Sequence, residues 1–159
     1  SPDRSQKRSV KRHGMLSVQE KELRFDPEHF ELYCRYQKVR HPGGGMDNDS
    51  EDQYRNSLLL SQADTSLYEF RENGKLTMVS IVDEVGDGLS SVYTFFDPAL
   101  PGASLGTYNV LWQIDLCRKL NLPYLYLGYW IEQCKKMAYK INFQPLQGYI
   151  GGKWQTMDK

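Results

Sequence analysis

SLYEFRENGKLTMVSIVDEVGDGLSSVYTFFDP, residues 66–98, decides the fold of this 159-residue chain. Apolar and polar residues alternate through it, and two turns, Asn73-Gly74 and Gly86-Asp87-Gly88, divide it into three runs. Asn-Gly between alternating runs is a strong signal of a tight hairpin. The stretch therefore predicts an antiparallel meander with strands near 66–72, 75–84 and 89–96.

Upstream of the meander, the sequence predicts one edge strand and two helices. Residues 15–25 alternate weakly and favour the strand. Asp26-Pro27 is typical of a helix N-cap and first helical position, and helical spacing of apolar residues continues to about His41. A Pro-Gly-Gly-Gly run ends that helix, and a second helix is expected to begin near residues 48–50, with acidic residues in its first turn.

Downstream, residues 104–148 predict a site beside the meander. Ser104 is a candidate cap for a helix to about Leu120, whose inner side is expected to carry Val110, Leu111, Ile114 and Cys117 or Leu116. After Pro123 we expect a strand, then a short helix near 132–139 and a last strand, 141–150, that closes the sheet. A strand that ends in a polar, aromatic-rich opening beside a helix N-terminus is a common place for a site.

The composition is that of one globular domain, with 40% hydrophobic and 25% charged residues. The net charge is zero, but both ends are basic. Residues 4–13 are expected to form a basic helix or an ordered arm. Two basic ends allow a polyanion to bind at one face, and a solvated charged face is the ordinary alternative.

Several classes of protein have no support in the sequence. The three Cys are widely spaced and form no CxxC pair, so no zinc site is expected. Reduced thiols favour a cytoplasmic protein. No apolar run approaches the roughly 20 residues of a membrane span, so no membrane association is expected. The basic, polar start is typical of the interior of a longer protein.

The predicted order of elements is β-α-α-β-β-β-α-β-α-β. It resembles that of the acyl-CoA N-acyltransferase (GNAT) superfamily. The resemblance implies an α/β (α+β) fold, a mixed sheet with flanking helices, formed by residues 1–159 as one domain. A likeness of fold alone does not decide function.

Residues 124–140, YLYLGYWIEQCKKMAYK, carry a more specific resemblance. They are similar to the bacterial aspartate/glutamate leucyltransferases of the N-degron pathway, which are related to eukaryotic arginyltransferases. The matching residues are Tyr126, Gly128, Tyr129, Trp130, Ile131, Cys134, Lys136, Met137, Tyr139 and Lys140. Further similar stretches follow in collinear order at 4–12, 40–46, 67–71, 89–98 and 104–114.

Two features depart from the family pattern. Family members usually begin with a further Cys-containing segment, so we expect this chain to be the transferase domain alone and that segment to be a candidate partner. The family also often has Tyr-Arg-Pro where this chain has Phe143-Gln144-Pro145.

The resemblance implies transfer of an amino acid from aminoacyl-tRNA to the α-amine of a protein that begins with Asp or Glu. The bacterial branch implies leucine as the amino acid, and arginine stays open. The partners would be charged tRNA and acidic N-termini, with aminoacyl-tRNA as co-substrate and no metal or cofactor. An acyltransferase that uses coenzyme A and a binding module without catalysis are the alternatives.

The implied reaction has three tasks, and each is assigned to a group of candidate residues. An acceptor carboxylate needs a cation or donors, which Arg40, His41 and Thr94 would supply. Proton handling and oxyanion support are assigned to Tyr93, Tyr129 and Lys140, of which Lys140 could instead hold the carboxylate. Aminoacyl-tRNA would be bound by Arg8, Arg12, Ser104, Leu105, Gly106, Tyr126, Trp130, Lys135 and Lys136, through helix N–H groups, stacking rings and cations. A C-terminal helix cap is the alternative for His41, a plain N-cap for Ser104, and core packing for each Tyr.

Overall fold

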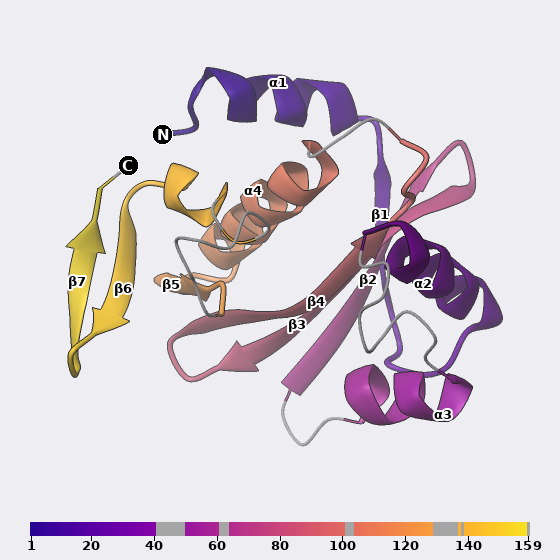
Figure 1. The fold of residues 1–159 in the computed structure, drawn as a ribbon. Helices are drawn as coiled ribbons and strands as arrows, with labels where there is room; N and C mark the ends of the chain where they lie inside the picture. The colour runs from indigo at the N-terminus through magenta and orange to yellow at the C-terminus, as the bar shows by residue number, and fades with distance from the viewer. Residues whose placement is uncertain (41–49, 61–63, 101–103, 129–136, 138, 159) are drawn as a thin grey trace.

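The structure, a computed structural model, describes residues 1–40, 50–60, 64–100, 104–128, 137 and 139–158. A five-stranded sheet in the order β1-β2-β3-β4-β5 lies at its centre (Figure 1). Its strands are β1 (Ser17–Lys21), β2 (Asp64–Glu72), β3 (Lys75–Val85), β4 (Gly88–Phe96) and β5 (Tyr124–Tyr126). The first four are antiparallel and β5 is parallel to β4, so the predicted meander, edge strand and mixed sheet are confirmed.

The first hairpin forms where the sequence predicts it. Asn73 and Gly74 both have positive φ, 50° and 82°, as a tight turn between twisted strands requires. β3 is buried from Leu76 to Val82 because helices cover both faces of the sheet.

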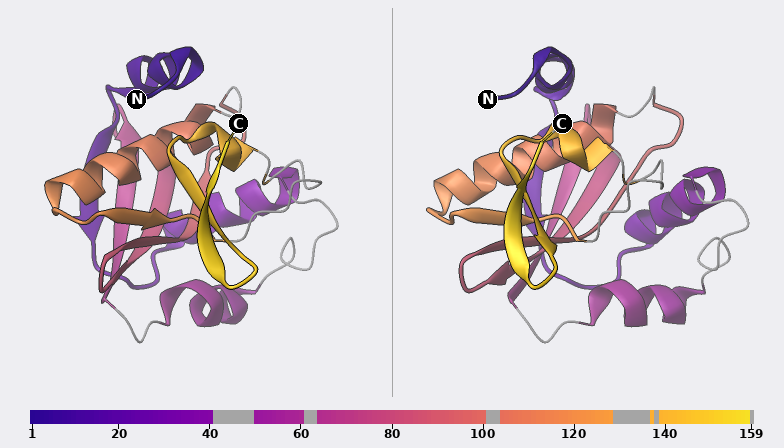
Figure 2. Two further views of the ribbon diagram at one scale, coloured as in Figure 1. Left: turned by 90° about the vertical axis from the view of Figure 1, so that its left-hand side faces the viewer. Right: turned by 60° about the vertical axis from the view of Figure 1, so that its left-hand side comes forward.

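Helices α1 (Arg4–His13) and α4 (Ser104–Lys119) lie on one face of the sheet (Figures 1 and 2). Helix α2 (Pro27–Arg40), the short helix α3 (Glu51–Tyr54) and the π-helical turn η1 (Arg55–Leu59) lie on the other. The predicted starts are confirmed: Asp26 Oδ1 accepts from the Glu28 amide at 2.8 Å, and the Ser50 side chain caps α3.

The core lies between the α2–α3 layer and the sheet and continues under α4. The Tyr33 ring centroid is 4.9 Å from that of Tyr54 and 5.5 Å from that of Phe95, and all three side chains are fully buried. Such aromatic contacts add about 0.5–1.5 kcal/mol each to the burial of the rings.

The buried side of α4 differs from the predicted one. Val110 and Cys117 are buried as expected, but Leu111, Ile114 and Leu116 are only half-buried. The other buried residues are Leu105, Tyr108, Asn109 and Gln113. The prediction is wrong for Leu111 and Ile114 because polar amides occupy inward positions, where their hydrogen bonds to the sheet offset the cost of burial.

The last predicted strand is also wrong. Residues 141–150 do not close the sheet: a 3₁₀ turn, η2 (Tyr139–Asn142), leads to a separate hairpin of β6 (Leu146–Ile150) and β7 (Lys153–Met157). Gly151 and Gly152 have positive φ, 59° and 84°, and turn the chain back on itself. The helix expected near 132–139 lies mostly outside the described residues.

β4 and β5 pair over three residues each, from Gly88↔Tyr124 to Ser90↔Tyr126. Gly88 allows this approach, because a Cβ atom there would lie 2.2 Å from the Tyr124 carbonyl oxygen. Beyond Ser90, β4 carries a bulge: Val82 pairs with Ser91 and Ile81 with Tyr93, so Val92 is the extra residue. We call residues 91–96 the β4 edge.

None of the described helices combines the length and apolarity that a membrane span needs.

Candidate active site

The β4 edge has the backbone features of a site. No described residue pairs with it on the β5 side, and its bulge interrupts the regular ladder with β3. Bulges often occur beside active sites, where they re-aim side chains. Tyr93 and Thr94 follow the bulge directly and point to opposite faces of the sheet.

On the α2 face, the Tyr93 hydroxyl accepts a hydrogen bond from Gln37 Nε2. Gln37 is 1% exposed, and the Tyr93 ring packs 6.1 Å from the Tyr33 ring and 6.2 Å from the Phe95 ring. These contacts fix the half-buried phenol in one orientation.

On the α4 face, Thr94 belongs to a buried polar network. Its hydroxyl accepts from Asn109 Nδ2 at 3.0 Å and lies 3.4 Å from the Ser80 hydroxyl. Gln113 Nε2 donates to Ser80 at 2.9 Å, and Gln113 Oε1 has no hydrogen-bond partner among the described residues. The network orients the hydroxyl of Thr94, a residue that the sequence analysis assigns to binding of the acceptor.

Arg40 lies at the far end of the β4 edge, where α2 ends. Its guanidinium carbon is 5.1 Å from the Phe96 ring centroid and 6.0 Å from that of Tyr36. Burial raises the pKa of Tyr36, and the nearby Arg40 charge opposes that shift. Burial likewise raises the pKa of Tyr139, with Tyr36 and Arg40 close by, so η2 approaches the end of α2. The arrangement holds an exposed cation over aromatic rings beside the β4 edge.

Lys140 tethers η2 to the chain that follows β5. Its Nζ donates to the Leu127 carbonyl oxygen at 2.7 Å, and the side chain is half-buried. This contact holds η2 at the exit of β5, and the catalytic role assigned to Lys140 stays a prediction.

The first turn of α4 is held by α1. Ser9 Oγ donates to the Ser104 carbonyl at 2.6 Å, and His13 Nε2 lies 2.7 Å from Ser104 Oγ. Burial and the Arg12 charge lower the pKa of His13. Leu105 is fully buried, so only its backbone could meet a ligand, and a Cβ on Gly106 would lie 4.0 Å from the Phe96 ring. The start of α4 thus lies beside Phe96 at the end of the β4 edge.

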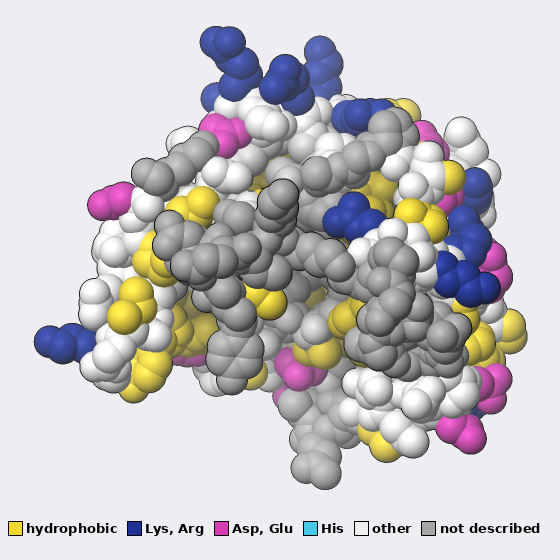
Figure 3. Space-filling view, viewed as in Figure 1, with side chains coloured by type: hydrophobic (Ala, Val, Ile, Leu, Met, Phe, Trp, Pro, Cys, Tyr) yellow, Lys and Arg dark blue, Asp and Glu magenta, His cyan; other side chains and the backbone are white. Residues whose placement is uncertain are grey.

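Basic residues line the outside of α1, so of the two expected forms, a basic helix or an ordered arm, the helix is confirmed. Arg8 and Arg12 are exposed, together with Arg4, Lys7 and Lys11, and their side chains gather at the top of Figure 3, over α1. Because α1 packs on α4, this basic surface adjoins the helix N-terminus expected to take phosphate or carbonyl groups.

The other candidates lie elsewhere. The Tyr126 hydroxyl donates to the Asp87 carboxylate at 2.9 and 3.0 Å, and its ring is 6.1 Å from that of Trp154, so it faces the β3–β4 turn and the β6–β7 hairpin. Asp87 raises the pKa of Tyr126 through that hydrogen bond. Five candidates lie outside the described residues: His41, Tyr129, Trp130, Lys135 and Lys136.

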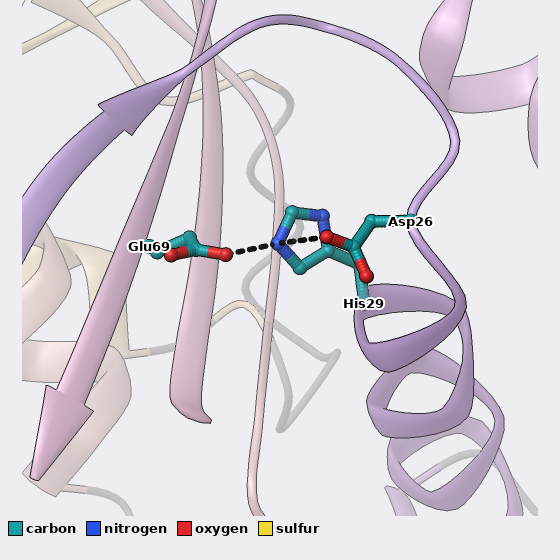
Figure 4. A group of neighbouring side chains, drawn as sticks. All are labelled: Asp26, His29 and Glu69. Atoms are coloured by element: carbon teal, nitrogen blue, oxygen red, sulfur yellow. Dashed lines mark hydrogen bonds and ion pairs between the residues drawn. The ribbon is translucent and has the colours of Figure 1, made fainter. Parts of the chain in front are cut away.

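One group in the described part of the chain has the ligand atoms of a metal site: Asp26, His29 and Glu69 (Figure 4). His29 Nε2 lies 2.6 Å from Glu69 and 3.9 Å from Asp26. Arg71 also contacts both Glu69 oxygens, at 3.2 and 3.3 Å. A cation here would displace a short hydrogen bond and meet the Arg71 charge and the positive end of α2. The geometry is that of an ion-pair clamp between α2 and β2.

Sequence reasoning assigned no site role to Gln37, Asn109, Gln113 or His13. The available signal was a polar residue at a position where helical spacing turns inward, since a buried amide needs a partner. The identity of the partner depends on the register of the strands, which cannot be predicted from the sequence of the helix.

Comparison with known proteins decides the family. Residues 28–150 match the family model described as "Arginine-tRNA-protein transferase, C terminus". The chain belongs to this family. It is 60% identical over 155 residues to the "Aspartate/glutamate leucyltransferase" of Nitrosospira multiformis, covering 98% of the chain and 62% of that relative. A relative of the same name from Methylobacillus flagellatus is 56% identical over 156 residues, with 98% and 63% covered. The chain thus spans under two thirds of the length of these relatives.

Solved structures confirm the GNAT-like fold of this family member. A ribosomal-protein-alanine N-acetyltransferase from Brucella melitensis superposes with a TM-score of 0.57 at 15% identity, covering 79% of the chain and 86% of that protein. A possible acetyltransferase from Clostridium difficile gives 0.58 at 14% identity, with 79% and 87% covered. At such identities the likeness concerns fold alone.

Proposed function

We propose that this chain is the catalytic domain of an aminoacyl-tRNA–protein transferase, which moves leucine from leucyl-tRNA to the α-amine of proteins that begin with Asp or Glu. The family match, with relatives named aspartate/glutamate leucyltransferase, carries the proposal. Such a modification would mark the acceptor protein for degradation. The enzyme would work in the cytoplasm, where charged tRNA is found, with the N-terminal segment of its relatives as a further partner.

The proposed reaction is an aminolysis. The acceptor nitrogen attacks the ester carbonyl carbon, a C–N bond forms, the C–O bond to the tRNA ribose breaks, and an amine proton ends on the ribose oxygen. An α-amine has a pKa of about 7.7–8.0, so part of it is neutral near pH 7. Because the ester is already activated, alignment alone could lower the barrier by up to about 7–11 kcal/mol. The reaction therefore needs no metal or cofactor besides aminoacyl-tRNA.

The geometry supports a division of roles. Arg40, exposed at the end of the β4 edge, would pair with the acceptor carboxylate. Tyr93 and Thr94 would support the oxygen that becomes negative as the amine attacks. The basic surface of α1, with Arg8 and Arg12, would contact acceptor-stem phosphates beside the start of α4.

An intact-mass assay tests the proposal. The protein is mixed with leucyl-tRNA or arginyl-tRNA and with peptides that begin with Asp, Glu or Ala. A gain of one leucine on the acidic peptides alone is expected. Transfer to the Ala peptide would refute the acidic specificity, and no gain with either tRNA, repeated after adding the N-terminal segment of a relative, would refute the activity.

Arginine is the second candidate donor, because the matching family model is described as an arginine-tRNA-protein transferase. An arginine-sized gain would keep the mechanism and change the donor. Acetyl-CoA, added in a separate reaction, tests the chemistry of the structural neighbours.

A further inference from the structure

Gln37 is a buried amide in an aromatic layer. It lies on the inward side of α2 with Tyr33 and Tyr36, and only 1% of it is exposed. A primary amide carries two N–H donors and a carbonyl acceptor, and burying them without partners is destabilising. An apolar residue of similar shape would fill this space without that cost.

The Gln37 amide donates to a hydroxyl of the β4 edge. Gln37 Nε2 donates to the Tyr93 oxygen, and the Tyr33 and Phe95 rings fix the phenol ring beside it. An amide N–H can only donate, so the phenol oxygen is the acceptor in this bond. The phenol proton must then be directed to a different acceptor.

The opposite face of the same strand repeats the arrangement. Asn109, 4% exposed on α4, donates from Nδ2 to the Thr94 hydroxyl at 3.0 Å. Two helices thus send buried amide donors to two successive hydroxyls directly after the Val92 bulge. In both bonds the hydroxyl oxygen is the acceptor, so each hydroxyl keeps its own proton for donation.

We propose that Gln37 is a positioning residue, which holds the Tyr93 hydroxyl as a hydrogen-bond donor to the ester carbonyl oxygen of the substrate. This inference rests on the proposed transfer function and narrows the role of Tyr93: the phenol stabilises developing negative charge and does not remove the proton of the acceptor amine. Asn109 has the same relation to Thr94.

Gln37→Glu is the decisive variant, because it keeps the shape of the side chain and replaces an amide donor with a carboxylate that only accepts. The Tyr93 proton would turn toward the new carboxylate and away from the substrate. We expect kcat to fall roughly 10- to 100-fold with KM nearly unchanged, since loss of an oxyanion donor acts in the transition state. As pH falls and the carboxyl group protonates, the ratio of variant to wild-type rate should recover. A pH-independent ratio would overturn the proposal.

Coupling with Tyr93→Phe separates positioning from general damage. In that background Gln37→Glu should lower kcat no further, whereas multiplying losses would refute the link between the two residues. Gln53→Glu is the matched control, because a carboxylate can replace the amide in the capping box of α3. If Gln37→Glu unfolds, Gln37→Met should show the same loss of kcat without recovery at low pH.

A second readout does not depend on transfer. The ¹³Cζ resonance of Tyr93, assigned by comparison with Tyr93→Phe, reports whether the phenol oxygen accepts a hydrogen bond. We expect it to shift in Gln37→Glu and Gln37→Met and to stay unchanged in Gln53→Glu. An unshifted resonance would refute the inference even with an active enzyme, and a shifted one without any transfer would refute the proposed function alone.

Discussion

His29 Nε2 lies 2.6 Å from Glu69 Oε2, and the two side chains are 2% and 3% exposed. This bond joins α2 to β2 across 40 residues of sequence. Arg71 extends it by contacting Glu69 and Glu28 together. The clamp fixes the N-terminal end of the helix that carries Gln37 and Arg40, and so contributes to the geometry of the β4 edge.

Glu69→Gln should lower the free energy of unfolding by about 1–3 kcal/mol, because it weakens the buried hydrogen bonds that Glu69 makes with His29 and Arg71. Urea denaturation measures the change. The control is Glu22→Gln: Glu22 and Arg24 are 3.8 Å apart but 83% and 79% exposed, and such pairs contribute at most about 1 kcal/mol. Equal effects of the two changes would contradict the clamp.

Stability should decline at acid pH. Burial alone would raise the pKa of Glu69, but hydrogen bonds from Arg71 and His29 outweigh it and lower that pKa below its ordinary 4.5. Burial alone would also raise the pKa of Asp97, but hydrogen bonds from the Ala99 amide and Lys75 outweigh it and lower that pKa below 3.8. Because both pKa values are lower in the folded state, their contribution is complete above about pH 5 and is lost as pH falls through the folded values. Denaturation midpoints measured from pH 7 to 3 check this, and constant midpoints would exclude it.

Arg40→Ala should raise KM for acidic peptides roughly 10- to 100-fold, since a charged hydrogen bond contributes about 1.5–3 kcal/mol. Transfer kinetics with Asp- and Glu-initiated peptides measure it. Arg55→Ala is the matched control, because Arg55 also lies over a ring, 4.3 Å from that of Phe25, but belongs to η1. An unchanged KM in Arg40→Ala would remove this residue from the acceptor site.

Arg8→Glu and Arg12→Glu should each weaken tRNA binding. Loss of a phosphate contact lowers the slope of log Kd against log salt by about one. Fluorescence anisotropy over a salt series gives the slope, and Lys21→Glu, exposed on β1, is the control. Salt-independent binding of charged tRNA by the wild type would refute this role for α1.

Ser9→Ala should loosen α1 from α4 at a cost of about 1 kcal/mol, because it removes the 2.6 Å bond to the Ser104 carbonyl. Hydrogen exchange of the α1 amides should accelerate in this variant and not in Ser5→Ala, whose side chain is exposed. Unchanged exchange would mean that other contacts, such as Gln6 Nε2 with the Asn142 carbonyl at 2.9 Å, hold the helix alone.

Local signals in the sequence predicted most elements of the fold. Asn73-Gly74, Asp26-Pro27 and Ser50 act through their own backbone geometry or through neighbours three residues away, so their structures follow from short stretches. The last strand was mispredicted because one such signal was not used: Gly151-Gly152 between two short strand-like stretches is typical of a hairpin turn.

The candidate site was less predictable. Tyr93, Thr94, Arg40 and the start of α4 were expected from family resemblance, and the structure places them along the β4 edge. Their partners were not expected, because the Gln37–Tyr93 contact spans 56 residues and depends on register. Tyr126 was grouped with them, but its bond to Asp87 directs it toward a different end of the strand.

Gly88 limits how far the spacing between β4 and β5 can be changed by redesign. Any side chain there would collide with the Tyr124 carbonyl and force β4 and β5 apart at their first pair. The close spacing of the two strands at this pair thus depends on a hydrogen atom where any other residue carries a Cβ. A redesign for a bulkier aminoacyl group would therefore have to change the loops around the β4 edge. Separating β4 from β5 at Gly88 would instead break the pairing of the two strands.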